Sequence, residues 1–278
     1  MNLSLCTISF RHHLHSIKEL AEWAQSNNFQ GIELWGIHAK HLKDESQYNR
    51  DWLASYNLYT SMISDYLPLH LSDKELLQAT RELSELGHRW GTNKLRTFAG
   101  QRASASINRE ERNSIVAKLK MICQELEREN QFLLLETHPN TLTDTVSSTL
   151  QLLEEVDHPA LRINFDVLHI WESGSDPIES LVKLKPFIMH FHFKNIISRN
   201  KLDVFSPHNV YAAAGSRDGM TPLFEGILDY EEFIKTAVSL AEVEASLEWF
   251  GGNVKEVLEK DAKKIMYLTK EINRLYVS

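Results

Sequence analysis

The apolar positions of the chain follow two alternating patterns. Short runs of apolar and β-branched residues alternate with longer segments in which apolar residues recur every three or four positions. The first pattern is typical of buried strands and the second of amphipathic helices. We expect strands at eight runs, which cover residues 3–9, 31–35, 58–64, 94–98, 131–136, 161–166, 187–193 and 244–248. Eight successive strand–helix units favour a single closed (β/α)8 TIM barrel, an α/β fold, over an open sheet.

Several of the predicted helices carry a start signal. Ser16, Ser72 and Asn253 are each followed three residues later by Glu, which is the spacing of a capping box. Asp176 precedes Pro177, and proline is favoured at the first position of a helix because its missing N–H is not needed there. The apolar spacing after Ser72 predicts a helix over 72–89.

The order of elements also bears on domain organisation. No tract rich in Pro, Gly and Ser divides the chain, so we expect residues 1–278 to form one domain. The first strand is followed by SFRHH rather than by a glycine-rich turn, which argues against a dinucleotide-binding sheet or a P-loop. The longest irregular stretch, at about 194–228, is expected to be an active-site loop, because loops of this length in compact domains are usually functional.

Composition narrows the function classes. The formal net charge is −8 and Lys and Arg do not cluster, so we expect a small-molecule substrate and no nucleic-acid partner. No apolar run is long enough to cross a membrane, and the N-terminal segment is typical of a strand rather than of a signal peptide. Cys6 and Cys123 are too few for a disulfide framework, which favours a reducing cytoplasmic location. A homodimer formed through the outer helices is compatible with this sequence.

Charged and imidazole side chains stand at the ends of four successive strands. Glu136, Asp166 and Glu248 each close a run of apolar residues, and His192 lies near the end of the seventh strand. In a barrel these strand ends converge on one cavity. Carboxylates gathered there without a cation would repel one another, so we predict a metal site formed by these four residues.

The predicted ligands also indicate the type of ion. Three carboxylates and one imidazole suit Mn²⁺, Mg²⁺, Co²⁺ or Zn²⁺, and no cysteine is placed to form a structural zinc site. Such an ion can polarise a carbonyl while a nearby imidazole moves a proton. His138 and His169 are the candidate bases, and Lys194 and Arg96 are cations that could hold an anionic substrate group.

Ten stretches of the chain resemble one known family. They are LCTISFRH, GIELWG, MISDYL, LRTFAG, LLLETHPNTLTDT, LHIWESG, HFHFKN, NVYAAAG, PLFEGI and ASLEWFG. Together they resemble the metal-dependent 3-dehydroshikimate dehydratases of petrobactin siderophore biosynthesis, within the xylose-isomerase-like barrel superfamily. The similarity extends over nearly the whole chain, and the blocks at 133–145 and 209–215 are the most specific.

The resemblance implies roles for individual residues. It places the family's metal ligands at Glu136, Asp166, His192 and Glu248, with Mn²⁺ as the favoured ion. It also implies catalytic roles for His138, His169 and Lys194. Substrate contacts are implied at Arg96, Phe205 and Tyr211, of which Phe205 and Tyr211 would cover the substrate from the long loop.

The implied reaction is loss of water from 3-dehydroshikimate to give 3,4-dihydroxybenzoate through a metal-stabilised enolate. The C3 ketone acidifies the hydrogen on C4, and the C5 hydroxyl then leaves. As a hypothesis, His138 is the base at C4, and His169 or a metal-bound water assists the leaving hydroxyl.

Other functions fit the same fold. A ketose isomerase or 3-epimerase would use the same metal site, with Glu136 and Glu248 as its acid–base pair. An endonuclease acting on abasic DNA is disfavoured by the negative net charge. A barrel retained only as a binding module would be expected to have lost a ligand, and all four are present. The sequence leaves open the physiological metal, the choice between siderophore synthesis and quinate or shikimate catabolism, and which histidine is the base.

Overall fold

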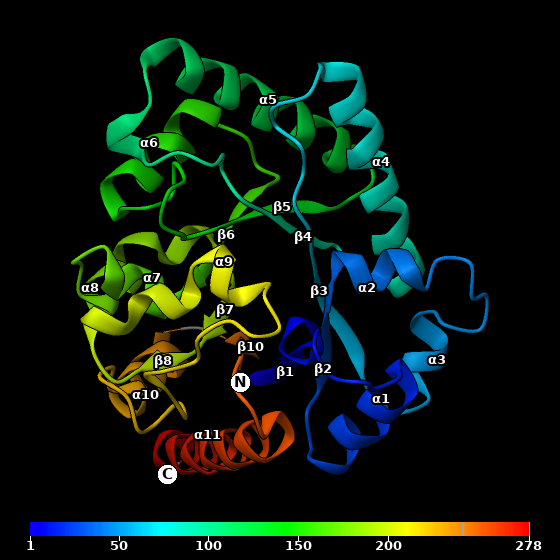
Figure 1. The fold of residues 1–278 in the computed structure, drawn as a ribbon, viewed down its shortest axis with the longest axis vertical. Helices are drawn as coiled ribbons and strands as arrows, with labels where there is room; N and C mark the ends of the chain where they lie inside the picture. Colours follow the sequence, from blue (N-terminus) through cyan, green and yellow to red (C-terminus); the bar gives the residue numbers. More distant parts are fainter. Residues whose placement is uncertain (241, 278) are drawn as a thin grey trace.

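The computed structural model describes residues 1–240 and 242–277 and contains a closed barrel of eight parallel strands (Figure 1). The order around the barrel is β1-β10-β7-β6-β5-β4-β3-β2. The strands are β1 (Asn2–Cys6), β2 (Gly31–Trp35), β3 (Tyr59–Ser64), β4 (Lys94–Thr97), β5 (Phe132–Glu136), β6 (Leu161–Asp166), β7 (Ile188–Phe193) and β10 (Glu244–Leu247). The prediction of an α/β TIM barrel is confirmed.

The helices lie around the outside of the barrel (Figure 1). The longer ones are α1 (Ile17–Ser26), α4 (Asp73–Trp90), α5 (Arg109–Arg128), α6 (Val146–Val156), α8 (Pro177–Leu184), α10 (Tyr230–Leu240) and α11 (Val254–Val277). Shorter ones are α2 (Gly36–His41), α3 (Arg50–Ala54), α7 (Val167–Glu172) and α9 (Pro207–Val210), and the 3-10 turns are η1 (Thr7–Phe10), η2 (Ser104–Ser106), η3 (Lys185–Phe187) and η4 (Arg199–Phe205). No helix among the described residues combines the length and the apolar character that crossing a membrane requires.

Four helices begin where the sequence predicts. Ser16 and Ser72 form capping boxes with Glu19 and Glu75 and begin α1 and α4. Asp176 accepts a hydrogen bond from the Glu179 N–H at the start of α8. The helix α11 begins at Val254, directly after Asn253 as predicted.

The first predicted strand is too long. Residues 3–9 were expected to be extended, but β1 ends at Cys6 and Thr7–Phe10 form the 3-10 turn η1. The hydroxyls of Thr7 and Ser9 accept hydrogen bonds from the N–H groups of Trp35 and Trp249. These contacts join the ends of β2 and β10 to the turn, so the chain leaves the sheet earlier than its apolar pattern indicates.

The barrel separates two kinds of environment. On β7, Phe191 and Phe193 point outward and pack on Phe233 of α10. The residues that alternate with them, His190 and His192, point inward and are fully buried. The apolar core therefore lies between the strands and the surrounding helices, whereas the barrel interior carries polar side chains.

The segment after β7 is not wholly irregular. Within 194–228, β8 (Asn195–Ile196) pairs antiparallel with β9 (Met220–Thr221), and η4 and α9 lie between them. The segment is held to the barrel by Arg11 Nε, which donates to the Val210 carbonyl at 2.5 Å, and by Arg217 Nε, which donates to the Phe250 carbonyl at 2.6 Å. The Tyr211 hydroxyl also donates to the Tyr66 hydroxyl at 2.6 Å.

Candidate active site

Three carboxylates and one imidazole meet inside the carboxyl end of the barrel. Nδ1 of His192 lies 3.5 Å from Glu248 Oε1, 3.6 Å from Glu136 Oε1 and 4.0 Å from Asp166 Oδ2. All four residues are buried. Burial lowers the pKa of His192, but the neighbouring carboxylates outweigh it and raise that pKa well above its ordinary value.

Local structure fixes the direction of the Asp166 carboxylate. Asp166 ends β6 and is the N-cap of α7, where its Oδ1 accepts a hydrogen bond from the His169 N–H at 3.1 Å. The second oxygen, Oδ2, faces His192 and Lys194. One residue thus starts a helix and points a carboxylate oxygen into the site.

Lys194 offsets part of the negative charge. Its Nζ lies 2.5 Å from Asp166 Oδ2 and 2.7 Å from Glu248 Oε2. Burial lowers the pKa of Lys194, but Asp166 and Glu248 raise it well above the ordinary value, so the ammonium is charged. Phe205 and Phe250 flank it, with ring centroids at 5.7 and 5.9 Å.

Arg96 enters the site from β4 with unused donors. Its Nε lies 3.0 Å from Glu136 Oε2, and the guanidinium lies over the rings of Phe98 and Tyr66. Arg96 is buried, and its Nη1 has no hydrogen-bond acceptor among the described residues, while Nε pairs with Glu136 without hydrogen-bond geometry. Buried guanidinium donors of this kind suit an incoming anionic oxygen.

The rings of His138 and His169 lie beside each other with centroids 4.5 Å apart. His138 Nδ1 lies 2.8 Å from the Pro139 carbonyl, which can only accept, so Nδ1 carries the proton. Nε2 has no hydrogen-bond partner among the described residues. His169 Nδ1 lies 2.7 Å from the carboxylate of Glu172.

The two histidines are in contrasting electrostatic environments. Burial, together with the neighbouring His169, lowers the pKa of His138 to about 4. Burial also lowers the pKa of His169, but Asp166 and Glu172 outweigh it and raise that pKa above the ordinary value. The pair therefore contains a neutral imidazole next to one that favours its charged form.

The two loop residues are placed differently. Phe205 is buried and its ring lies 6.2 Å from that of His169 and 6.1 Å from that of Phe250. Tyr211 lies further out, at the rim, where it is 43% exposed and stacks on Trp35. Phe205 thus lies at the histidine pair, whereas Tyr211 contacts the rim residues Trp35 and Tyr66.

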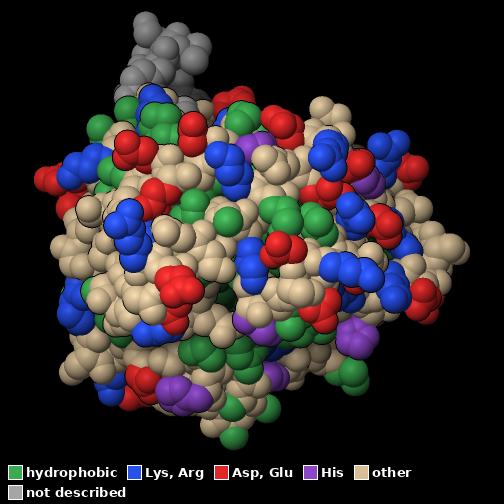
Figure 2. Space-filling model, turned by 90° about the horizontal axis from the view of Figure 1, so that it is seen from above, with side chains coloured by type: hydrophobic (Ala, Val, Ile, Leu, Met, Phe, Trp, Pro, Cys, Tyr) green, Lys and Arg blue, Asp and Glu red, His purple; other side chains and the backbone are tan. Residues whose placement is uncertain are grey.

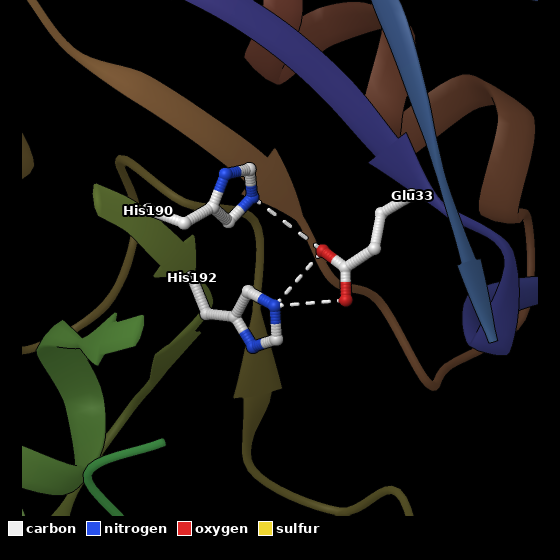
Figure 3. A group of neighbouring side chains, drawn as sticks. All are labelled: Glu33, His190 and His192. Carbon is white, nitrogen blue, oxygen red and sulfur yellow. Dashed lines mark hydrogen bonds and ion pairs between the residues drawn. The ribbon is translucent and has the colours of Figure 1, made fainter. Parts of the chain in front are cut away.

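Glu33, on β2, was not predicted to belong to the site. It is fully buried and lies 2.9 Å from His192 Nε2 (Figure 3). The other three carboxylates face the opposite ring nitrogen, Nδ1. Burial raises the pKa of Glu33, but His192 and His190 outweigh it and hold that pKa well below the ordinary value. The signal in the sequence was a charged residue between Ile32 and Leu34 in an otherwise apolar strand.

The arrangement fits a divalent cation. Asp166, His192 and Glu248 offer ligand atoms close enough to share one ion, and Glu136, Asp166 and His169 form a second such group. The buried His192 Nδ1 has no hydrogen-bond partner among the described residues. Oxygen-rich sites with one imidazole suit Mg²⁺, Mn²⁺ and related ions. The unpaired nitrogen among three carboxylate oxygens is the feature that a bound cation would explain.

Known proteins share this architecture. A family model described as the xylose isomerase-like TIM barrel matches residues 21–270. A 3-dehydroshikimate dehydratase from Bacillus anthracis is 50% identical over 269 residues, which cover 95% of this chain and 96% of the relative.

Solved structures agree with this match. The crystal structure of the probable 3-DHS dehydratase AsbF, involved in petrobactin synthesis in Bacillus anthracis, has a TM-score of 0.92 and 49% identity, covering 96% of this chain and 99% of its own. A xylose isomerase-like TIM barrel protein from Mycobacterium smegmatis, in complex with magnesium, has a TM-score of 0.71 over 98% of this chain and 97% of its own. At 16% identity, the second structure shows the shared fold alone.

Proposed function

The chain belongs to the xylose isomerase-like TIM barrel family, and from that premise we propose that it is a 3-dehydroshikimate dehydratase. This lyase would convert 3-dehydroshikimate to 3,4-dihydroxybenzoate and water. The observation that carries the proposal is the histidine pair beside the carboxylate cluster: a neutral His138 with a free Nε2, next to His169, whose charged form is favoured.

Glu136, Asp166, His192 and Glu248 would hold one divalent ion. We propose Mn²⁺ as the preferred ion, with Mg²⁺, Co²⁺ and Zn²⁺ as alternatives. When bound, the ion supplies Lewis-acid polarisation of the substrate ketone. Lys194 then keeps the oxygens of Asp166 and Glu248 in place through its two short contacts.

His138 would remove the proton from C4. Its Nδ1–H is engaged by the Pro139 carbonyl, so the free Nε2 is the atom that accepts the proton. The buried surroundings keep the ring neutral before the reaction, because a low pKa leaves the base unprotonated at neutral pH.

His169 would help the C5 hydroxyl to leave. As C4=C5 forms, the C–O bond at C5 breaks and a proton from His169 converts the leaving group to water. Glu172, at 2.7 Å from His169 Nδ1, would hold the charged ring in place. A final proton loss from C6 and proton gain at the C3 oxygen make the ring aromatic, which draws the reaction to completion.

Arg96, Phe205 and Tyr211 would position the substrate. The buried Nη1 donor of Arg96, which has no acceptor among the described residues, matches the carboxylate of 3-dehydroshikimate. Phe205 would cover the ring beside His169, and Tyr211 would close the entrance as part of the segment 194–228. This segment is the active-site loop of the single domain that we propose.

The reaction class is tested by offering the metal-loaded protein two substrates in parallel. With 3-dehydroshikimate we expect the catechol absorption of 3,4-dihydroxybenzoate to appear, and with a ketohexose we expect no new sugar. A new ketose or aldose without catechol formation would contradict the dehydratase and favour a sugar isomerase or epimerase at the same site.

We also propose a cytoplasmic role in siderophore synthesis, as AsbF is involved in petrobactin synthesis. Cys6 and Cys123 are free and buried, a state that a reducing compartment preserves. Deleting the gene should abolish siderophore release under iron limitation, and added 3,4-dihydroxybenzoate should restore it. Loss of growth on quinate with normal siderophore release would contradict this role.

A further inference from the structure

Glu33 contacts the proposed metal ligand His192 from the far side of its ring. Both oxygens of Glu33 lie within hydrogen-bond distance of His192 Nε2, at 2.9 and 3.1 Å (Figure 3). The Ser64 hydroxyl donates to Oε1 of the same carboxylate. Glu33 is on β2 and His192 on β7, and these strands are not neighbours in the barrel, so the contact crosses its interior.

A carboxylate in this position determines which ring nitrogen of His192 carries a proton. An ionised carboxylate can only accept hydrogen bonds, so the nitrogen facing Glu33 must be the one that donates. A neutral imidazole has a proton on only one of its two nitrogens, and only the other can bind a metal. With Nε2 protonated, the lone pair of His192 is on Nδ1, which faces Glu136, Asp166 and Glu248.

The charge of Glu33 lies in an otherwise apolar stretch of β2. Glu33 lies between Ile32 and Leu34, and all three side chains are buried. A buried carboxylate is costly unless it is hydrogen-bonded and paired. Its hydrogen-bond partners are Ser64 and His192, because the adjacent His190 Nε2 is 3.6 Å from Glu33 but 2.8 Å from the Ser246 hydroxyl.

We propose that Glu33 is a positioning residue for the metal centre: it holds the His192 ring in place and directs its lone pair toward the three carboxylates. Metal-bound histidines are commonly oriented in this way by a carboxylate on the other ring nitrogen. The inference rests on the proposed metal centre and adds to it a residue that would not touch the ion.

Two variants of Glu33 test the proposal. Glu33→Gln keeps the shape and one acceptor oxygen but loses the charge, and Glu33→Leu keeps a similar volume but loses the acceptor. We expect Mn²⁺ affinity, measured on metal-stripped protein by competition with a chelating dye, to fall by about 10-fold in the first and about 100-fold in the second. The matched control is Glu244→Gln, since Glu244 pairs with Lys94 at the other end of the barrel strands.

A spectroscopic readout separates positioning from general loss of structure. In Co²⁺-loaded wild-type protein, the one imidazole bound to the ion should give a single exchangeable, strongly shifted N–H proton signal from His192. Its exchange with D₂O should be slow because Glu33 holds the proton. Exchange should become fast in Glu33→Gln and stay slow in Glu244→Gln.

The outcomes distinguish this inference from the metal centre itself. If wild-type protein binds Mn²⁺ and Glu33→Gln and Glu33→Leu bind it equally well, with unchanged exchange, Glu33 is not a positioning residue although the metal centre stands. If wild-type protein binds no Mn²⁺, the metal centre and this inference both fail. Should these two Glu33 variants not fold, Glu33→Asp keeps the charge but withdraws the carboxylate from His192 Nε2, and unchanged proton exchange in that variant would overturn the proposal.

Discussion

His138 and His169 lie side by side, but their Nδ1 atoms have different partners. His138 faces a backbone carbonyl and His169 faces the carboxylate of Glu172. A carbonyl stabilises a neutral imidazole with a free Nε2, whereas a carboxylate stabilises the charged form. Two identical side chains thereby acquire the complementary properties of a base and an acid.

Replacing His138 by Asn should remove the base and leave the metal centre. The Asn amide can still donate to the Pro139 carbonyl, so we expect little disturbance of the loop. General bases contribute about 10²–10⁴-fold to rate, and we expect kcat to fall by about that factor, with Mn²⁺ affinity unchanged. Steady-state kinetics with 3-dehydroshikimate measures this.

The control is His88→Asn, on the exposed side of α4, where His88 pairs with Glu129. It should keep wild-type kcat. A His138→Asn enzyme with near-normal kcat would assign the base to another residue.

At the scale of single elements, helix α4 depends on its first turn. The Ser72 hydroxyl accepts from the Glu75 N–H, and the Glu75 carboxylate accepts from the Ser72 N–H at 3.1 Å. Ser72→Ala removes the first of these bonds, and we expect it to lower the free energy of unfolding by about 1 kcal/mol. Urea denaturation measures the change, and activity at low temperature should be normal.

A matched control is Ser26→Ala at the end of α1, because the exposed Ser26 hydroxyl donates only to the Glu22 carbonyl. We expect its effect to stay within about 0.5 kcal/mol. If Ser72→Ala and Ser26→Ala lowered the free energy of unfolding equally, the capping box of α4 would contribute no more to stability than an ordinary exposed hydroxyl.

Strands could be predicted from the sequence where a short apolar run alone determines their limits. The other seven predicted strands begin and end within one residue of the observed ones, because each is a short apolar run between polar segments. The pair β8 and β9 was not predicted, since each strand has two residues and their pairing joins positions far apart in the chain. The end of β1 was also missed, because hydroxyl contacts of Thr7 and Ser9 with distant backbone decide it.

At the scale of the whole molecule, closure of the barrel creates the site. Glu136, Asp166, His192 and Glu248 were recognisable from the sequence because each stands at or near a strand end, and the structure brings them together. Their role as metal ligands stays a prediction. Glu33 was not predicted because its partner His192 is 159 residues away and contacts it only across the closed barrel.

On the face in Figure 2, acidic and basic side chains are interspersed over the molecular surface.

A buried carboxyl on the last helix, α11, should make the free energy of unfolding depend on pH. Asp261 of α11 is buried and accepts a hydrogen bond from the Leu223 N–H at 2.9 Å, which ties the segment after β9 to the helix. Burial raises the pKa of Asp261 from 3.8 to about 6. Between these values the folded state binds more protons than the unfolded state, so this carboxyl makes the protein less stable as pH rises through that window.

Asp261→Asn removes the titration and keeps an acceptor oxygen for Leu223. As the pH is raised from 5 to 8, the free energy of unfolding of the variant should rise by about 1 kcal/mol relative to that of the wild type. Urea denaturation at the two pH values measures the difference. A difference that does not change with pH would contradict the role of burial at Asp261.

The central claim is that one divalent ion, held by these four residues, is required for dehydration of 3-dehydroshikimate. The most direct measurement is a titration of metal-stripped protein with Mn²⁺ while the initial rate of 3,4-dihydroxybenzoate formation is recorded. We predict no product without metal and a rate that saturates at one ion per chain, with no activation of Glu248→Gln over the same range. Product formation without metal, or full activation of the Glu248→Gln variant, would contradict the claim.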